Sequence, residues 1–394
     1  MAIRSIDDLN LAGKRVFVRV DFNVPQKAGV IQDDSRIRAA LPTLKRVLEA
    51  GGSLILASHL GRPKAPDPAF SLAPVAARLA DLLGIPVALA PEVVGPEAQR
   101  LCAGLAPGQA LLLENVRFHP GETKNDPELS RQLAALADLY VNDAFGACHR
   151  AHATTAGMAA CFAPDRRAAG YLLQKELGAL RRVLDAPEKP FVAVIGGAKV
   201  SDKIAVVDNL LGRVDRLLVG GGMAYTFLAA RGVAVGDSLL EADRIEGAAL
   251  TLEKARSAGC ELLLPTDHVV ARDLTEGAET RTTAGEAIEA GWKGLDIGPK
   301  TREAFAAALA GARTVVWNGP MGVFENPAFA EGTFSVARAV AGCPGFTVVG
   351  GGDSVSAVKK SGVADRIGHI STGGGASLEF LEGKTLPGVA ALEG

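Results

Sequence analysis

Five residues with cationic or potentially cationic side chains stand in, or just after, the ends of apolar segments in the first half of the chain. They are Arg36, His59, Arg62, Arg117 and Arg150. Arginine is favoured where a phosphate or carboxylate is bound through two parallel hydrogen bonds, because the guanidinium group presents its N–H groups as a planar fork. Any one of these side chains could be an ordinary solvated surface charge. Their shared position predicts a site for a small anion instead.

A carboxylate and an amide follow the segment VFVRV in the same half of the chain. This segment alternates apolar positions in the way of a half-buried strand, and Asp21 and Asn23 come directly after it. A purely structural strand needs neither group at its end. We therefore interpret Asp21 and Asn23 as part of a site.

Glycine takes the place of these charges in the second half of the chain. The segment VIGGAKVSDKI runs from a strand through Gly196 and Gly197 to Lys199, and then into a helix that Ser201 could cap, with Lys203 four residues after Lys199. Such a turn exposes N–H groups and the positive end of a helix to a phosphate, and lysines add mobile charges. Neither a Walker A motif nor G-x-G-x-x-G occurs. The pattern indicates a polyphosphate site without the fingerprint of a nicotinamide cofactor.

Two further glycine turns occur in VVGGGDSVSAVKK and STGGGASLEF. Asp353 stands at the expected start of a helix, where it could be an N-cap or could hold Mg²⁺, which is bound by few carboxylates together with phosphate oxygens. A small-anion site and a polyphosphate site in one chain favour phosphoryl transfer. That chemistry needs positioning and charge neutralisation more than a nucleophilic side chain.

The elements that position these residues are expected to be parallel sheets covered by helices. Short β-branched or Leu-rich segments alternate with stretches of helical period along the chain, which is the pattern of such a fold. Ligands of open α/β sheets bind beyond the carboxyl ends of the strands, so the two halves are expected to carry different sites. The expected strands are RVFVRV, SLILAS, ALLLEN and LYVND in the first half, and FVAVIGG, RLLVGGG, ELLLP, TVVWNG and FTVVGGG in the second.

Length and composition are those of an ordinary globular protein with two domains: 394 residues, of which 48% are hydrophobic and 22% are charged. The formal net charge of −2 gives no global basic field for nucleic acid. No segment reaches the roughly 18 consecutive apolar residues of a membrane span, and the start MAIRSIDDLNLAGKR lacks the apolar core of a secretory signal. We therefore expect a cytoplasmic protein.

The residues that bind structural metals or form disulfides do not group in this sequence. His149 and His152 stand three residues apart, but no cluster of Cys, Asp or Glu completes a metal shell with them. The five cysteines are odd in number, widely spaced and never in a C-x-x-C pair. They are expected to pack as small hydrophobic residues.

Seven motifs, in order and over essentially the whole chain, resemble those of the phosphoglycerate kinase family. They are RVDFNVP, SHLGRP, ENVRFHPGE, GGAKVSDKI, WNGPMGVFE, GGGDS and STGGGASLEFLEGKTLPG. The resemblance implies reversible phosphoryl transfer from the acyl phosphate of 1,3-bisphosphoglycerate to MgADP, giving 3-phosphoglycerate and MgATP in glycolysis. It also implies an α/β fold of two Rossmann-like three-layer domains with parallel sheets, joined by a hinge helix, with the active site in the interdomain cleft.

The domain boundaries expected on this basis are as follows. Residues 1–170 form the 3-phosphoglycerate domain, which residues 375–394 complete; residues 171–186 form the linking helix; and residues 187–374 form the nucleotide domain. We expect a monomer that transfers the phosphoryl group in line after domain closure. Its ligands would be 3-phosphoglycerate or 1,3-bisphosphoglycerate and ATP or ADP with Mg²⁺, and neither nucleic acid nor a membrane.

The resemblance also implies a role for each matching residue of the first site. Asp21 and Asn23 would hold the glycerate hydroxyl and the carboxyl end of the substrate. Arg36 would face the reacting carboxyl and, with Lys199, balance charge on the phosphoryl group in flight, while Gly373 and Gly374 would offer N–H groups. The residues that would bind the non-transferred phosphate are His59, Arg62, Arg117 and Arg150.

For the nucleotide, the resemblance implies phosphate contacts from Lys203 and Asn318, a ribose contact from Glu325 and a metal contact from Asp353. Glu325 could also be a surface residue, and Asn318, which precedes a glycine, could be a turn former. The full implied set is Gly197, Lys199, Lys203, Gly221, Asn318, Glu325, Gly350, Gly351, Gly352, Asp353 and Ser354, in which Gly197 and Gly221 would let the backbone approach the adenine.

The departures from the family pattern are small. Ala147 and Cys148 stand where Thr-Ala is common, and Ser354 replaces a frequent Thr. Two alternatives stay open at this point: another small-acid kinase or nucleotide-dependent ligase with a similar two-lobe architecture, and a catalytically silent anion sensor. The ligase or other kinase would not need five cations for its second substrate, and the sensor would have lost Lys199 or Asp353.

Overall fold

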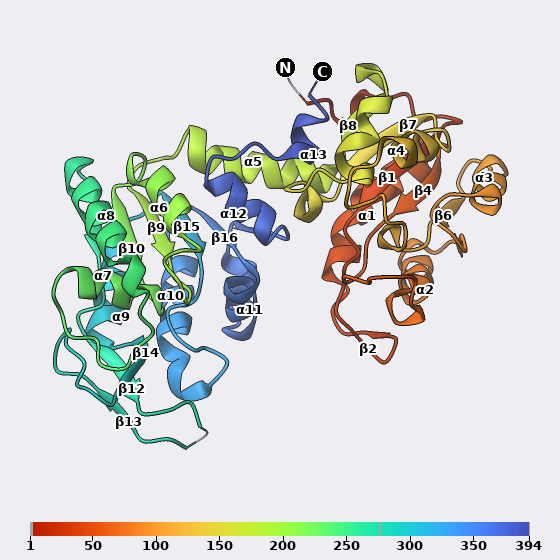
Figure 1. The fold of residues 1–394 in the computed structure, drawn as a ribbon. Helices are drawn as coiled ribbons and strands as arrows, with labels where there is room; N and C mark the ends of the chain where they lie inside the picture. Colours follow the sequence, from red (N-terminus) through yellow and green to blue (C-terminus); the bar gives the residue numbers. More distant parts are fainter. Residues whose placement is uncertain (1–2, 276, 394) are drawn as a thin grey trace. The chain divides into compact units, whose positions relative to one another are not determined.

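The computed structural model describes residues 3–275 and 277–393. The chain forms two compact units: one ends at Gly178 and resumes at Thr385, and the other spans Ala179–Lys384. Each unit contains a six-stranded sheet in which all pairs are parallel (Figure 1). The expected α/β class is therefore confirmed. This division counts residues 375–384 with the second unit, whereas the sequence analysis assigned the chain from Gly375 onward to the first.

The sheet of the first unit has the strand order β5-β6-β4-β1-β7-β8. In its register Arg19 of the central strand β1 lies beside Ala57 of β4 and Asn142 of β7, so the carboxyl ends of these three strands meet at one edge. The strands are β1 (Arg15–Val20), β4 (Ser53–Ala57), β5 (Val87–Leu89), β6 (Ala110–Leu112), β7 (Leu139–Asp143) and β8 (Arg167–Ala169), and β2 (Gln26–Lys27) pairs separately with β3 (Val30–Ile31).

Both faces of this first sheet are buried. Val16, Val18 and Val20 of β1 pack with the apolar stripes of two helices in one core. Because side chains alternate along a strand, Phe17 faces the other side, where its ring stacks on Tyr140 with the centroids 6.2 Å apart. The helices of this unit are α1 (Ser35–Glu49) and α2 (Ala73–Leu83), which form that core, with α3 (Pro96–Ala103), α4 (Pro127–Ala134) and α13 (Pro387–Ala390).

The sheet of the second unit has the order β11-β10-β9-β15-β16-β17. Its strands are β9 (Phe191–Ile195), β10 (Arg216–Val219), β11 (Glu261–Leu263), β15 (Thr314–Asn318), β16 (Phe346–Gly350) and β17 (His369–Ile370). A separate antiparallel sheet of the order β13-β12-β14 consists of β12 (His268–Ala271), β13 (Thr280–Thr282) and β14 (Lys293–Ile297). The fully buried Trp317 of β15 lies in the main core of this unit.

Helix α5 (Tyr171–Asp185) begins in the first unit and ends in the second, over nearly the same residues as the expected linking helix. The helices of the second unit are α6 (Ile204–Leu211), α7 (Met223–Ala230), α8 (Ile245–Ser257), α9 (Pro299–Leu309), α10 (Glu331–Ala341), α11 (Gly352–Lys360) and α12 (Gly375–Leu381). Among the described residues, none of the helices is long and apolar enough to cross a membrane.

Candidate active site

Asp21, at the carboxyl end of β1, is the buried centre of the first site. Arg36, in the first turn of α1, donates from Nη1 to both carboxylate oxygens of Asp21, at 3.2 Å to Oδ1 and 3.1 Å to Oδ2. The same nitrogen donates to the backbone oxygen of Asn23 at 3.2 Å. The sequence-predicted pair Asp21 and Asn23 is therefore fixed to the start of α1.

The charge of Asp21 is stabilised despite its burial. Burial by itself would raise the pKa of this carboxyl, but His59, Arg36 and Arg19 outweigh it, and the pKa lies below its usual value. Burial in turn lowers the pKa of His59 to about 3, so this imidazole is neutral at pH 7. The two guanidinium groups therefore carry the attraction that keeps Asp21 ionised.

The loop after β4 joins the next part of the site through Gly61. The backbone N–H of Gly61 donates to Oδ1 of Asn23 at 2.8 Å, and the guanidinium group of Arg117 donates to the Gly61 oxygen. Nε of Arg117 is buried and has no hydrogen-bond partner in the described part of the chain. Burial, reinforced by Arg19 and opposed by Glu122, lowers the pKa of Arg117.

Arg62 and Arg150 are the exposed cations of this site. Arg62 makes no side-chain hydrogen bond or ion pair with any described residue, yet it is close enough to contribute to the lowered pKa of Arg117. Arg150 similarly contributes to the pKa of His152, which burial above all lowers to about 4. The structure thus links all five predicted residues to this region. Arg36, His59 and Arg117 are linked through direct contacts, with His59 neutral at pH 7. Arg62 and Arg150 are linked through the effects of their charges on Arg117 and His152, and Arg150 has a further interaction within the protein.

Arg19, Glu122 and Thr154 also belong to this region, and the sequence analysis missed them. All three are fully buried. Arg19 donates from Nε to Oγ1 of Thr154 at 2.7 Å, and this hydroxyl lies 2.6 Å from Oε1 of Glu122. The one available signal was an arginine in the interior of a strand that is otherwise apolar.

The edge of the second sheet is made of glycine backbone, as predicted. The N–H of Gly196 donates to the Asn318 oxygen at 2.9 Å, and that of Gly197 to the Pro320 oxygen at 3.0 Å. Gly221 has a φ of +68°, and a Cβ at this position would lie 2.6 Å from the backbone oxygen of Gly197. Glycine is thus required for the packing of these turns on each other, in addition to any approach by a ligand.

Ser201 does not cap a helix. Helix α6 begins only at Ile204, after a turn, and Ser201 binds Glu241 with its N–H at 3.0 Å and its hydroxyl at 2.6 Å. Lys199 lies in the same loop and is exposed, without a side-chain hydrogen bond to any described residue. The loop is therefore held by Glu241, while the ammonium group of Lys199 stays available.

Lys203 and Asn318 form a contact between the first glycine turn and β15. Nζ of Lys203 donates to Oδ1 of Asn318, and burial lowers the pKa of Lys203. Nδ2 of Asn318 is buried without a partner among the described residues. A turn former would lie exposed, whereas Asn318 is 1% exposed, which disfavours that interpretation.

Asp353 is not a helix cap either. Gly351, with a φ of +92°, occupies the N-cap position of α11 without any side-chain cap, and Asp353 lies in the first turn. Its carboxylate is exposed and forms no hydrogen bond or ion pair with the described residues. The neighbouring Ser354 is buried, and its hydroxyl accepts from the N–H of Gly319 at 2.6 Å. The N-cap interpretation was wrong, and the carboxylate of Asp353 is available for another partner.

The remaining predicted residues lie on turns of the second unit. Glu325 is exposed in the turn that follows β15. Gly374 has a φ of +44° at the N-cap position of α12, and the N–H of Gly373 donates to Oγ of Ser371 at 3.1 Å. One of the two N–H groups expected to be offered to a ligand is therefore already bonded.

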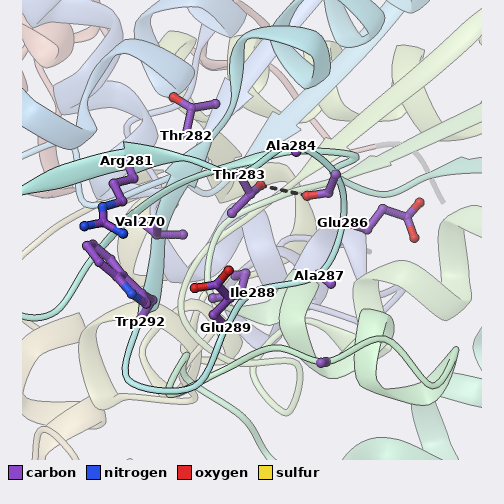
Figure 2. A pocket seen from close by; sticks show the side chains of 12 residues that line it. Val270, Arg281, Thr282, Thr283, Ala284, Glu286, Ala287, Ile288, Glu289 and Trp292 are labelled. Carbon is purple, nitrogen blue, oxygen red and sulfur yellow. Dashed lines mark hydrogen bonds between the residues drawn. The ribbon is translucent and has the colours of Figure 1, made fainter.

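A pocket of about 610 Å³ in the second unit lies on the antiparallel sheet (Figure 2). The guanidinium carbon of Arg281 lies 4.3 Å from the ring centroid of Trp292, and Thr283 donates to the Gly285 oxygen at 2.7 Å. The Glu286 carboxylate pairs with Arg231 at 3.1 Å. None of the residues predicted for either site lines this pocket, and the side chains of Arg281, Thr283 and Glu286 bond within the protein.

Two α/β units, one with a cationic strand edge and one with a glycine-lined edge that carries lysines and an available carboxylate, define a two-domain kinase. The family model for phosphoglycerate kinase matches residues 6–384. The phosphoglycerate kinase of Moorella thermoacetica is 59% identical over all of this chain and 99% of its own length, and the cytosolic phosphoglycerate kinase of Triticum aestivum is 54% identical over all of this chain and 98% of its own length. A solved structure of phosphoglycerate kinase from Coxiella burnetii superimposes with a TM-score of 0.91 at 44% identity, over 99% of both chains. The chain belongs to the phosphoglycerate kinase family.

Proposed function

We propose that this protein catalyses reversible phosphoryl transfer from the acyl phosphate of 1,3-bisphosphoglycerate to MgADP, giving 3-phosphoglycerate and MgATP in glycolysis. Family membership supports the reaction. The observation that carries it is the first site, where Arg62 and Arg150 are exposed and Nε of Arg117 is buried without a partner in the described residues. A compact, highly charged phosphate would supply the missing acceptor for Nε of Arg117 and would be attracted by the exposed guanidinium groups.

In this proposal His59, Arg62, Arg117 and Arg150 bind the non-transferred phosphate of 3-phosphoglycerate. Asp21 and Asn23 bind the glycerate hydroxyl and the carboxyl end. Because Oδ1 of Asn23 already accepts from the N–H of Gly61, its Nδ2 amide is the group left to donate to the substrate.

The nucleotide would bind at the glycine-lined edge of the second sheet. Lys203 and Asn318 would contact its phosphates, and the unpaired Nδ2 of Asn318 supports this role, because a phosphate oxygen would satisfy it. Gly197 and Gly221 would border the adenine and Glu325 would bind the ribose. Residues 350–354 would offer backbone N–H groups at the start of α11, where the positive end of the helix favours an anion.

The nucleotide would carry Mg²⁺, with Asp353 as the protein ligand. Among the described residues there is no group of three or more His, Cys, Asp and Glu side chains that could hold a metal ion. The exposed Asp353 carboxylate fits the alternative, because Mg²⁺ is commonly bound by one or two carboxylates together with substrate phosphates. When bound, the ion neutralises part of the phosphate charge.

The transfer itself would depend on Arg36 and Lys199, with Gly373 and Gly374 as further donors. Fixed positive charge is most valuable where the transition state spreads negative charge over the moving phosphoryl group. Arg36 belongs to the first unit and Lys199 to the second. One phosphoryl group has to reach both side chains, so in-line transfer would require the two units to close over it and exclude water.

A coupled assay with ATP, Mg²⁺ and 3-phosphoglycerate tests the proposal directly. We expect turnover with 3-phosphoglycerate and none above background with glycerate or acetate. Neither of these two acids carries the non-transferred phosphate that the cationic site would bind. Preference for acetate or glycerate would favour another small-acid kinase or a ligase, and phosphate binding without turnover would favour a silent anion sensor. Monomeric state and cytoplasmic location stay predictions, and the name of the cytosolic relative from Triticum aestivum supports the second.

A further inference from the structure

Arg19 is a fully buried arginine in the interior of β1 whose three nitrogens are all engaged. Nε donates to Oγ1 of Thr154 at 2.7 Å, Nη1 donates to the oxygen of Val20, and Nη2 lies 3.2 Å from Nδ1 of His59. A guanidinium group can only donate hydrogen bonds. Nδ1 of His59 must therefore accept, and it cannot carry a proton.

The neutral His59 ring then has its proton on Nε2. This atom has no hydrogen-bond partner among the described residues, so its N–H is available to a ligand. Protonation of Nδ1 would break the bond from Arg19 and place a second positive charge beside it. Asp21, whose Oδ1 lies 4.0 Å from Nδ1, opposes this effect, but burial together with the charges of Arg19, Arg117 and Arg36 lowers the pKa of His59 to about 3.

Thr154 and Glu122 determine the direction of the hydrogen bond between Nε of Arg19 and Oγ1 of Thr154. Oγ1 of Thr154 accepts from Arg19, so the Thr154 hydroxyl must give its own proton to Oε1 of Glu122, 2.6 Å away. The N–H of Thr154 donates to Oε2 of Glu122 at 3.0 Å. Both carboxyl oxygens accept, which is the arrangement that an ionised Glu122 favours. Thr154 lies in the π-helical turn Ala153–Gly157, whose backbone also accepts from the Tyr140 hydroxyl at 2.8 Å.

Burial and the neighbouring charged and titratable groups together determine the charge of Glu122. The pKa of Glu122 lies above its usual value, because burial outweighs the opposing effects of Arg19, the two hydrogen bonds from Thr154 and Arg117. Nδ1 of His152 lies 3.9 Å from Oε1 of Glu122, and the pKa of His152 is about 4, so this ring is neutral at pH 7. Both Arg19 and Arg117 face the charge of Glu122, and Arg19 is connected to it by hydrogen bonds through the Thr154 hydroxyl.

We propose that Glu122, Thr154 and Arg19 form a buried positioning relay that holds His59 in its Nε2–H tautomer, so that His59 meets the substrate phosphate as a neutral hydrogen-bond donor. The inference about the phosphate rests on the proposed function. The inference about the tautomer does not rest on the proposed function, because every contact that determines it is made between residues of the first unit and none involves a substrate. Arg19, Thr154 and Glu122 act through His59 and need not touch the substrate.

Nitrogen-15 NMR of the histidine side chains in the wild-type protein tests the tautomer without any substrate. The His59 signals are assigned by their loss in His59→Gln. We expect a protonated Nε2 and an unprotonated Nδ1 throughout pH 5–8. A proton on Nδ1, or titration with a midpoint near the ordinary pKa of about 6.5, overturns the relay even if the enzyme is fully active.

A matched pair of variants tests whether the relay matters for binding. Thr154→Val keeps the shape of the side chain but removes the acceptor of Arg19, whereas Thr154→Ser retains the hydroxyl. For Val we expect a mixture of His59 tautomers and a roughly tenfold rise in KM for 3-phosphoglycerate, with KM for ATP unchanged. Ser should restore both the NMR pattern and KM to within about twofold. An unchanged tautomer in a folded Val variant, or equal rises in both KM values, contradicts the positioning role. If Val does not fold, the wild-type spectrum still decides the tautomer.

Discussion

Lys203 donates a hydrogen bond from Nζ to Oδ1 of Asn318, which leaves the Nδ2 amide of Asn318 buried without a partner among the described residues. An unsatisfied buried donor costs free energy, roughly 1–3 kcal/mol in typical cases. The cost is recovered if a ligand oxygen binds there. This single contact therefore links a loop lysine, a strand-end amide and the expected position of the nucleotide phosphates.

Asn318→Asp should weaken nucleotide binding selectively. The new carboxylate would form an ion pair with Lys203, remove the Nδ2 donor and repel the phosphates, so we expect KM for ATP to rise roughly tenfold or more. KM for 3-phosphoglycerate should stay the same. Steady-state kinetics with each substrate varied in turn measures both values. Equal rises would indicate general damage and remove the case for a phosphate contact.

Lys199→Ala should act on turnover rather than on binding. If this ammonium group stabilises the phosphoryl group only during transfer, kcat should fall roughly 10²–10³-fold while the affinity for 3-phosphoglycerate barely changes. Lys300→Ala, which removes a lysine of α9 that donates to the Ala284 oxygen, is the matched control and should retain normal kcat. Normal turnover with weak binding in Lys199→Ala is the result that would refute the role.

Arg62→Ala should raise KM for 3-phosphoglycerate, roughly tenfold, and leave KM for ATP nearly unchanged. The reason is that an arginine that binds the non-transferred phosphate contributes to ground-state binding of that substrate alone. Competition by sulfate should weaken in parallel. The control is Arg38→Ala, which removes an arginine of α1 that pairs with Asp34 at 2.9 Å instead of facing the site. A parallel rise in both KM values would point to misfolding rather than to loss of an anion contact.

The buried carboxyl of Asp296 should make the second unit less stable as the pH rises. Burial raises its pKa from 3.8 to about 7, so the native state binds a proton that the unfolded state has already lost between about pH 4 and pH 7. Stability should therefore fall over this window, by roughly 1 kcal/mol per pH unit from this group. In Asp296→Asn an amide oxygen can still accept from the N–H of Gly332, which donates to Oδ2 at 2.6 Å.

Thermal unfolding at pH 5 and pH 8 measures this effect. We expect Asp296→Asn to lose several degrees less in Tm than the wild type between these pH values, since about 1 kcal/mol corresponds to roughly 2–4 °C in a domain of this size. Asp365→Asn, at an exposed position of the same unit, should behave like the wild type. Identical pH dependence in all three proteins would show that Asp296 is ionised in the folded state.

Closure of the two units should depend on both substrates. Small-angle X-ray scattering should show little compaction with 3-phosphoglycerate or a MgATP analogue alone and clear compaction with both. The reason is that, in the proposed mechanism, Arg36 and Lys199 would have to reach one phosphoryl group. Gly374→Val, at a position with a φ of +44°, should reduce turnover far more than either affinity. A constant radius of gyration under all four ligand conditions would rule out closure.

Local sequence pattern was enough to predict the long strands. β1, β4, β7, β9, β15 and β16 are runs of β-branched and apolar residues bounded by turns, and each runs close to the expected segment. The same pattern did not reveal β5, β8 and β17, which have two or three residues each, nor the antiparallel sheet β12–β14. Length alone does not explain the difference, because β6 and β11 also have three residues and lie within the expected segments ALLLEN and ELLLP. The missed strands lack such a Leu-rich run, and their extended form depends on pairing with a neighbouring strand.

The sequence alone also determined which residue types the sites contain, because motifs keep arginines, glycines and lysines at fixed positions after strands. Only the tertiary structure decided what each side chain contacts. Asp353 and Ser201 resemble helix caps locally, yet Gly351 precedes α11 and Ser201 binds Glu241, forty residues away. Arg19 resembles an outward-facing polar residue, but both faces of its parallel sheet are buried. Its partner Thr154 lies in a distant π-helical turn and is in turn bonded to Glu122. Contacts between residues so far apart in the chain depend on packing, which no local pattern encodes.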